Sequence, residues 1–277
     1  MPVEERIQFA TTPLETGLGL HYAEQADPTG EAIVFLHGHS DSWFSFSSVL
    51  PLLSPEYHAF ALTQRGHGDS DKPQCCYTPE DFAADVDAFM EAVAIEEATL
   101  VGASTGPLFA QRVALSHPPR VSRLVLVGAQ RPANEANEVV LGLQEEVRAL
   151  EDPVPPEFVR AFQEGTIHYP VPREFLDTVV SESSKLPARV WRDYWEGAVL
   201  SIDRDYVLPL REIDVPTLML WGEQDPLFPR EEQERLAAAI PGATLKVYPE
   251  TSHAVHWDRP EWVVRDLEEL MKKPRPE

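Results

Sequence analysis

The stretch ATLVGASTG, at residues 98–106, decides how this chain of 277 residues folds. Its first half is a short, mostly apolar run typical of a buried strand, and it leads directly into a Gly-x-Ser-x-Gly turn centred on Ser104. Residues 107–115 then form a run that predicts a helix. A sharp turn between a strand and a helix lifts a serine hydroxyl out of the sheet, and it needs small residues at 102 and 106 to avoid a backbone clash. This context makes Ser104 a candidate nucleophile.

The helix after the turn favours the same chemistry. Free N–H groups and a partial positive charge at its N-terminus would face the oxygen on which negative charge develops during acyl transfer. The alternative is a tight glycine turn that contains an incidental serine. The interpretation therefore depends on whether the rest of the chain supplies catalytic partners in suitable places.

Short apolar runs rich in β-branched and aromatic residues recur along the chain, with helical stretches between them. Continuous runs of this kind suit parallel strands that are covered on both faces. Pro79 begins a helical stripe of apolar residues that extends to residue 93, and proline suits the first turn of a helix. The alternation predicts an α/β fold with a mostly parallel, doubly wound sheet of about eight strands. We expect these strands at residues 7–11, 18–23, 32–36, 59–62, 99–101, 123–127, 217–220 and 245–248.

The alternation breaks between residues 131 and 208, where prolines separate helical segments and no convincing strand occurs. A helical block between two strands of a sheet predicts a cap over the carboxyl edge of that sheet, where ligands bind in open α/β folds. We therefore expect residues 1–130 and 209–277 to form the core and residues 131–208 to form a helical cap. A packing embellishment without a role in binding is the alternative. The expected cap helices are residues 134–150, 157–164, 173–184 and 188–200.

The expected strand at residues 32–36 ends in His37, Gly38 and His39. A glycine directly after a strand allows the backbone to bend so that the next N–H group faces the pocket. We expect the main-chain N–H groups of His39 and Thr105 to form the oxyanion hole, because Thr105 follows the nucleophile. The side chains at these two positions then matter less than the backbone conformation.

Ser104 needs a general base, and the loop after a late strand is the expected place for it. His253 follows the expected strand at residues 245–248, and His256 is its near competitor. We favour His253 and expect His256 to pack or to line the pocket. Asp225, in a loop after the expected strand at residues 217–220, is placed to orient the imidazole and to stabilise its charged form, with Glu223 as the runner-up. The chain order Ser104, Asp225, His253 is a known order of such triads.

At this point the chain resembles the α/β-hydrolase superfamily over nearly its whole length. The segments that carry the resemblance are HG at 37–38, RGHGDSD at 65–71, GASTG at 102–106, WGEQD at 221–225 and SHAVHW at 252–257. The resemblance implies a lid of helices where we expect the cap, and activity on esters, lactones or other acyl compounds without a cofactor. It also implies that residues 65–71 form a structural turn, so that His67, Asp69 and Asp71 belong to the scaffold.

The sequence departs from the usual pattern of this superfamily in three places. Ala103 stands where many relatives have His or Asn, Pro107 stands where they have Gly, and Ser252 replaces the usual Gly before the catalytic histidine. Proline is tolerated in the first turn of a helix, so we expect the turn at Ser104 to survive. A serine at 104 excludes the branch whose nucleophile is an aspartate, which resembles haloalkane dehalogenases and epoxide hydrolases.

The sequence predicts a cofactor-free serine hydrolase that cleaves a carboxylic ester or lactone through an acyl-enzyme. A mostly apolar small molecule is the expected substrate. The alternatives are carbon–carbon bond hydrolysis or perhydrolysis by the same triad, and a small-molecule receptor that retains the triad. Our candidates for the walls of the substrate pocket are Trp43, Phe44, Phe109, Trp191, Trp195, Phe228 and Trp257.

Composition limits the partners. There are 46 Asp and Glu residues against 23 Lys and Arg residues, and the formal net charge is −23. Such a surface repels phosphate backbones, so we expect neither nucleic acid nor anionic membranes as partners. We find no apolar run of about 20 residues and no signal peptide, so we expect a cytoplasmic protein, either a monomer or a homodimer.

The only cysteines are the neighbours Cys75 and Cys76. Adjacent cysteines bridge only with strain, and two side-by-side ligands without a suitably spaced histidine make a poor zinc site. We therefore expect ordinary loop thiols, and no metal.

Overall fold

The computed structural model describes residues 7–25, 28–129, 138–199 and 209–273. Its centre is an eight-stranded sheet in the order β1-β2-β4-β3-β5-β6-β7-β8. The pairs β1·β2 and β2·β4 are antiparallel, and the other neighbours are parallel. This is the mostly parallel sheet that the sequence predicts. The strands are β1 Ile7–Pro13, β2 Gly19–Gln25, β3 Glu31–Leu36, β4 Tyr57–Leu62, β5 Ala98–Ala103, β6 Val121–Val127, β7 Thr217–Gly222 and β8 Thr244–Tyr248.

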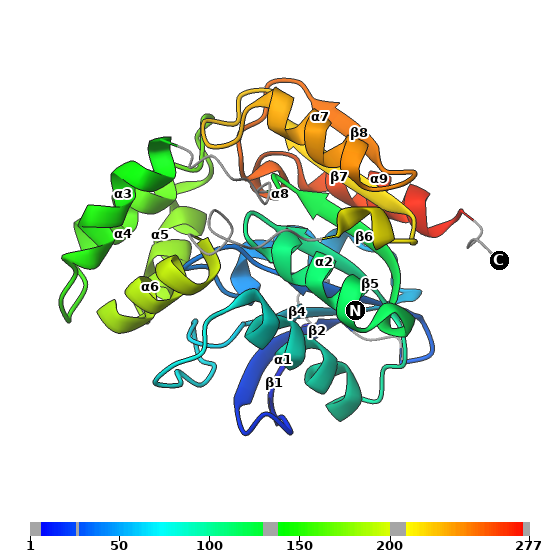
Figure 1. The fold of residues 1–277 in the computed structure, drawn as a ribbon, viewed down its shortest axis with the longest axis horizontal. Helices are drawn as coiled ribbons and strands as arrows, with labels where there is room; N and C mark the ends of the chain where they lie inside the picture. Colours follow the sequence, from blue (N-terminus) through cyan, green and yellow to red (C-terminus); the bar gives the residue numbers. More distant parts are fainter. Residues whose placement is uncertain (1–6, 26–27, 130–137, 200–208, 274–277) are drawn as a thin grey trace.

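Helices cover both faces of the sheet (Figure 1). Val34 and Leu36 of β3 belong to the apolar cluster on the side of α1 and α2, whereas Ile33 and Phe35 belong to the cluster on the side of α9. Because successive side chains of a strand point to opposite faces, a strand buried on both faces needs an unbroken apolar run. The α-helices of the described residues before β6 and after β7 are α1 Pro79–Ala92, α2 Gly106–Ser116, α7 Arg230–Ala239, α8 Val255–Asp258 and α9 Pro260–Met271.

Among the described residues between β6 and β7, four α-helices gather on one side of the molecule in Figure 1. They are α3 Glu138–Arg148, α4 Pro156–Glu164, α5 Arg173–Ser183 and α6 Ala188–Tyr194, and a π-helical turn, Trp195–Val199, continues α6. The four expected cap helices thus correspond to observed helices. Parts of the first and last expected helices, and the junctions at residues 130–131 and 208–209, fall wholly or partly outside the described residues.

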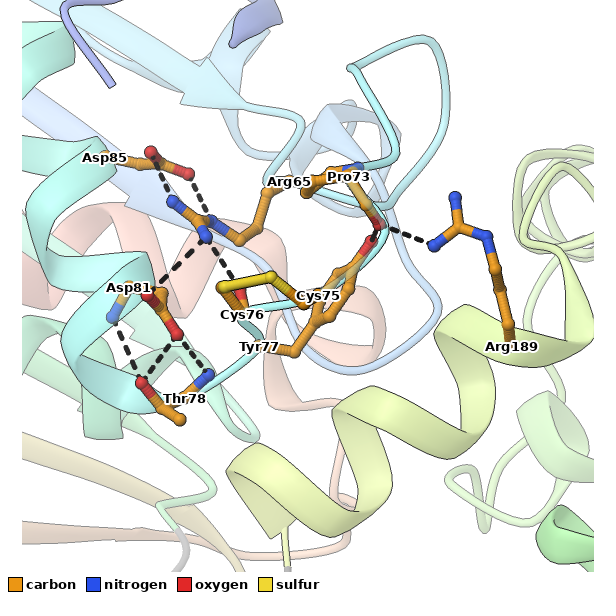
Figure 2. The surroundings of a disulfide bond; sticks show 9 residues. All are labelled: Arg65, Pro73, Cys75, Cys76, Tyr77, Thr78, Asp81, Asp85 and Arg189. Atoms are coloured by element: carbon orange, nitrogen blue, oxygen red, sulfur yellow. Dashed lines mark hydrogen bonds and ion pairs between the residues drawn. A yellow bond between two sulfur atoms is a disulfide. The ribbon is translucent and has the colours of Figure 1, made fainter. Parts of the chain in front are cut away.

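The loop before α1 corrects one expectation, because Cys75 and Cys76 are joined by a disulfide (Figure 2) and are not free thiols. The chain turns at Cys76, where φ is +76°. In extended backbone the side chains of neighbouring residues point to opposite faces. The turn at Cys76 ends the extended conformation, so that the side chains of Cys75 and Cys76 can meet. The expectation failed because the sequence did not reveal this turn.

The same loop contacts both α1 and α6 (Figure 2). Arg65 pairs with the buried Asp85 of α1, at 2.6 Å from Nε to Oδ2, and its Nη1 donates to the carbonyl of Cys76 at 2.6 Å. Arg189 of α6 donates to the carbonyl of Pro73 at 2.5 Å. These contacts give Arg65 a structural part, in agreement with the scaffold expected for residues 65–71.

Candidate active site

Ser104 stands in the turn between β5 and α2 with a φ of +60°, a left-handed conformation that is rare for residues other than glycine. Its N–H donates to the carbonyl of Val127 at 2.9 Å. The flanking glycines show why the turn needs small residues. A Cβ on Gly102 would lie 2.4 Å from the nitrogen of Pro107, and one on Gly106 would lie 2.2 Å from the carbonyl oxygen of Leu36. The predicted strand, turn and helix are therefore all present, and the half-buried Ser104 is held in a strained backbone conformation.

The two expected oxyanion donors flank this turn. Within the part of the chain that the structure describes, the main-chain N–H groups of His39 and Thr105 donate no hydrogen bond to another main-chain group. A Cβ on Gly38 would lie 2.8 Å from the Cβ of Ser104, so the loop after β3 passes directly beside the serine. The hydroxyl of Thr105 is paired with the hydroxyl of Tyr194 at 2.5 Å, which ties the turn to α6.

His253 and Asp225 follow β8 and β7, and Nδ1 of His253 lies 2.9 Å from Oδ2 of Asp225. Both side chains are almost completely buried, with exposed fractions of 3% and 0%. The other carboxylate oxygen of Asp225 accepts the N–H groups of Leu227 and Phe228, at 2.8 and 3.1 Å. Nε2 of His253 is buried and has no hydrogen-bond partner among the described residues. That atom is thus available to a hydroxyl or a substrate.

The competing candidates, Glu223 and His256, do not form the pair with Asp225 or His253. Glu223 is exposed. Nε2 of His256 lies 2.9 Å from Oγ of Ser45, and burial lowers the pKa of His256 to about 3. His256 is therefore a neutral residue that lines the site, as expected from the sequence.

Two compartments border Ser104. The larger has a volume of about 290 Å³ and lies beneath α3, α4 and the turn that continues α6, with walls that include Leu143, Phe158 and Trp195. The smaller has a volume of about 50 Å³, and its walls include His253, Asp41 and Gln163. Ser104 lines both compartments, whereas His253 lines only the smaller one.

Three of the seven expected wall residues line these compartments. Trp195 and Phe228 border the larger one, and Trp257 borders the smaller one. The other four do not, which corrects the expectation. Phe109 is fully buried in the core against Phe82 of α1, at 4.2 Å between ring centroids. The remaining three have other partners. Trp43 packs on Phe9, and Phe44 packs on Phe175. Trp191 packs against the rings of His39 and Phe162.

Sequence reasoning missed several residues of the site. Phe158 and Phe162 lie one turn apart on α4 and both line the larger compartment, so their spacing of four residues could have indicated a common face. Asp41 and Gln163 line the smaller compartment. No local pattern marks these two, because their partners are distant in the chain.

The other histidines near the site are neutral parts of its framework. Burial lowers the pKa values of His37 and His39 well below the ordinary value, and lowers that of His67 to about 4. His37 accepts the N–H of Gln64 at 2.9 Å. The ring of His39 stacks on Tyr194, at 4.4 Å between ring centroids. Among the described residues no group of three or more metal-ligating side chains occurs, and no helix is long and apolar enough to cross a membrane.

Parallel strands thus deliver Ser104, Asp225 and His253 to one edge of the sheet, and fold and site together define the class of α/β-hydrolases. The family model described as the alpha/beta hydrolase fold matches residues 31–260. The chain belongs to this family, and by family it is a hydrolase.

Similar proteins are known from sequence and from structure. A non-heme chloroperoxidase from Streptomyces lividans is 30% identical, with 95% of this chain and all of the relative covered. An esterase from Exiguobacterium antarcticum has a similar structure, with a TM-score of 0.84, 24% identity, and coverage of 96% of this chain and 100% of the esterase. An enol-lactonase from Burkholderia xenovorans has a TM-score of 0.82, 20% identity, and coverage of 95% of this chain and 100% of the lactonase. At these identities the two structures establish the fold alone.

Proposed function

We propose that the protein is a serine hydrolase that cleaves a carboxylic ester or lactone of a mostly apolar small molecule, without a cofactor. The observation that carries the proposal is the buried pair of His253 and Asp225, which are 2.9 Å apart, beside a serine held at a φ of +60°. A tight glycine turn with an incidental serine would not require a buried pair of histidine and aspartate beside it. The similar esterase and lactonase structures support the same reaction class.

The reaction would proceed in two halves. His253 accepts the proton of Ser104 as Oγ bonds to the acyl carbon, and the main-chain N–H groups of His39 and Thr105 hold the oxyanion. The bond to the leaving oxygen then breaks, and His253 returns the proton to that oxygen. A water molecule repeats both steps on the acyl-enzyme and releases the acid. Asp225 keeps the proton of Nδ1 in place and stabilises the charged imidazole.

The helices α3 to α6 would act as a cap that shapes the substrate site. Leu143 of α3, with Phe158 and Phe162 of α4, contributes apolar walls to the larger compartment. A volume of about 290 Å³ is at the lower end of the range for small-molecule sites. The walls therefore favour an acyl group of medium length.

Perhydrolysis is a second candidate, favoured by the names of two relatives. The relative at 30% identity is a non-heme chloroperoxidase, and another at 28% identity, from Synechocystis, is named a putative non-heme chloroperoxidase. Hydrogen peroxide in place of water would attack the acyl-enzyme and yield a peracid and free Ser104. The same triad and oxyanion hole serve both reactions.

The test is hydrolysis of p-nitrophenyl butyrate and octanoate by the wild type and by Ser104→Ala. Nitrophenolate leaves without being protonated, so these esters report on the acyl steps wherever the leaving group lies. We expect turnover by the wild type and a loss of about 10⁵-fold or more in the variant, with an unchanged melting temperature. Full activity of Ser104→Ala would refute the proposal. Peracid formation from acetate and hydrogen peroxide, with poor ester turnover, would favour the second candidate.

A further inference from the structure

The smaller compartment has more polar groups in its lining than the larger one, although apolar atoms still form most of its walls. It is bordered by Asp41, Gln163, His253 and His256, which all lie close to Ser104. The volume of this compartment, about 50 Å³, is about a sixth of that of the larger compartment, about 290 Å³. It therefore accepts the smaller part of a substrate. The site thus divides a substrate into a large apolar part and a small polar part.

Asp41 is held rigidly in this compartment. Its residue is 8% exposed, and its Oδ2 accepts the hydroxyl of Ser45 at 3.0 Å. Its Oδ1 accepts the side-chain amide of Gln163, from α4, at 3.1 Å. Oγ of Ser45 in turn lies 2.9 Å from Nε2 of His256 and accepts the indole N–H of Trp257 at 3.0 Å. Three separate parts of the chain therefore fix the position of one carboxyl group.

The carboxyl group keeps the capacity to accept a further hydrogen bond. Each carboxylate oxygen has two lone pairs, and each oxygen of Asp41 has one protein donor. The amide of Gln163 also lies within hydrogen-bond distance of Ser40 and Ser183, both at 2.9 Å, so its donors are committed. Burial raises the pKa of Asp41 to about 7, and the group accepts a hydrogen bond in either protonation state. A hydroxyl group on the bound molecule is the partner that suits it.

The position of His253 decides which part of the substrate enters the smaller compartment. A general acid must lie within hydrogen-bond reach of the oxygen that it protonates. His253 protonates the leaving oxygen, and it borders only the smaller compartment. The leaving alcohol therefore lies there, and the acyl group lies in the larger compartment. Water that enters the vacated space reaches the same histidine for the second half of the reaction.

We propose that Asp41 determines specificity by binding a hydroxyl group of a short leaving alcohol, so that the preferred substrates are medium-chain acyl esters of small diols or polyols. The inference rests on the proposed serine hydrolase function and names the substrate class of that site. A leaving group with a methyl in place of the hydroxyl would leave the carboxyl group of Asp41 facing an apolar atom, which costs binding energy in the transition state.

The experiment compares 2-hydroxyethyl octanoate with n-propyl octanoate, two esters with the same number of heavy atoms. Released octanoic acid is titrated at a constant pH of 8.5, where the carboxyl group of Asp41 is mainly ionised, and the ratio of the two kcat/KM values is the readout. We expect the wild type to favour the hydroxyethyl ester by about tenfold, the discrimination that one hydrogen bond to a charged group provides. 2-Methoxyethyl octanoate, which can only accept a hydrogen bond, should resemble the propyl ester.

Variants of Asp41 test whether its carboxyl group causes the preference for the hydroxyethyl ester. Asp41→Asn retains the size of the side chain, and we expect its ratio to fall to about two or three; in Asp41→Ala the ratio should approach one. The matched control is Asp214→Asn, an exposed aspartate before β7, whose ratio should equal that of the wild type. A structural loss alone would lower both kcat/KM values and leave their ratio unchanged.

The outcomes separate this inference from the proposed function. Wild type that hydrolyses p-nitrophenyl octanoate through Ser104 but treats the hydroxyethyl and propyl esters alike would overturn the inference and leave the proposed function intact. A tenfold preference that persists in Asp41→Asn and Asp41→Ala would also overturn it. No activity of the wild type on any of these esters would refute the proposed function itself. The wild-type comparison needs no variant, so it stands even if the Asp41 variants fail to fold.

Discussion

Oδ2 of Asp225 lies 2.9 Å from Nδ1 of His253, and both side chains are almost completely buried. A carboxylate in this position keeps the proton of the imidazole on Nδ1, so that Nε2 faces the reacting atoms as a base. The other oxygen of Asp225 accepts two main-chain N–H groups. The pair is therefore oriented by the backbone of the loop after β7.

Asp225→Asn should lower kcat for p-nitrophenyl butyrate by about 10⁴-fold, because an amide would favour the wrong tautomer of His253. Steady-state kinetics near neutral pH provide the measurement. Glu223→Gln is the matched control, because Glu223 is exposed in the same loop. Equal losses in the two variants would show that Asp225 is not the partner on which catalysis depends.

Glycine substitutions test the turn at Ser104. Gly106→Ala should destabilise the fold by at least about 3 kcal/mol, since the new Cβ would lie 2.2 Å from the carbonyl oxygen of Leu36 and β3 would have to move. Gly142→Ala is the control, because among the described residues no heavy atom beyond the backbone of α3 itself lies within 4 Å of the new Cβ. That variant should gain up to about 1 kcal/mol from the higher helix propensity of alanine. Urea denaturation of both variants provides the free energies of unfolding, and two similar values would contradict the expectation.

Tyr194→Phe tests the link between the turn and α6. The change leaves the buried hydroxyl of Thr105 without the partner that lies 2.5 Å away, at a cost of about 1–3 kcal/mol. The melting temperature should fall by several degrees. The main chain of Thr105 supplies the expected oxyanion donor, so we also expect a lower kcat with little change in KM. A variant with wild-type stability would show that the pair contributes nothing.

Much of the fold could be predicted from the sequence because the strands are unambiguous. A run such as residues 32–36 is apolar at every position and rich in β-branched and aromatic residues, as a short strand covered on both faces requires. The turn at Ser104 could also be predicted, because its glycines, the strand before it and the helix after it are adjacent in the sequence. Residues at the ends of strands also meet at one edge of a sheet, so His253 and Asp225 could be expected near Ser104.

The walls of the site could not be predicted in this way, because they depend on how distant helices pack. Phe109 follows the turn closely in sequence, yet its helix presents it to α1 and not to the substrate site. Asp41 was missed for a similar reason. Its network reaches Gln163 and, through Ser45, His256, which is 211 residues from Ser45. The neighbouring sequence does not predict which face of the fold an aromatic or acidic residue will occupy.

The pH dependence of stability tests the environment of Asp41. Burial raises the pKa of Asp41 to about 7 in the folded protein, against about 3.9 in an unfolded chain. Between these values the folded state holds a proton that the unfolded state releases. The contribution of Asp41 to stability is therefore fully present below about pH 4 and is lost as the pH rises through about 7. The groups that face its carboxyl are Ser45 and Gln163, with His253 and His256 nearby.

Asp41→Asn removes this titration and leaves the neighbouring histidines in place. The free energy of unfolding of the variant, relative to that of the wild type, should rise between pH 5 and pH 8 by about 1–3 kcal/mol, because only the wild type loses the stabilisation from the protonated carboxyl. His256, whose pKa burial lowers to about 3, makes the wild type and the variant alike less stable towards acid pH, so its effect largely cancels in the difference. Urea denaturation of both proteins at pH 5, 6, 7 and 8 measures that difference. A difference that stays constant, or that falls as the pH rises, would mean that the carboxyl of Asp41 titrates like an exposed aspartate and is not held in the buried compartment beside Ser104.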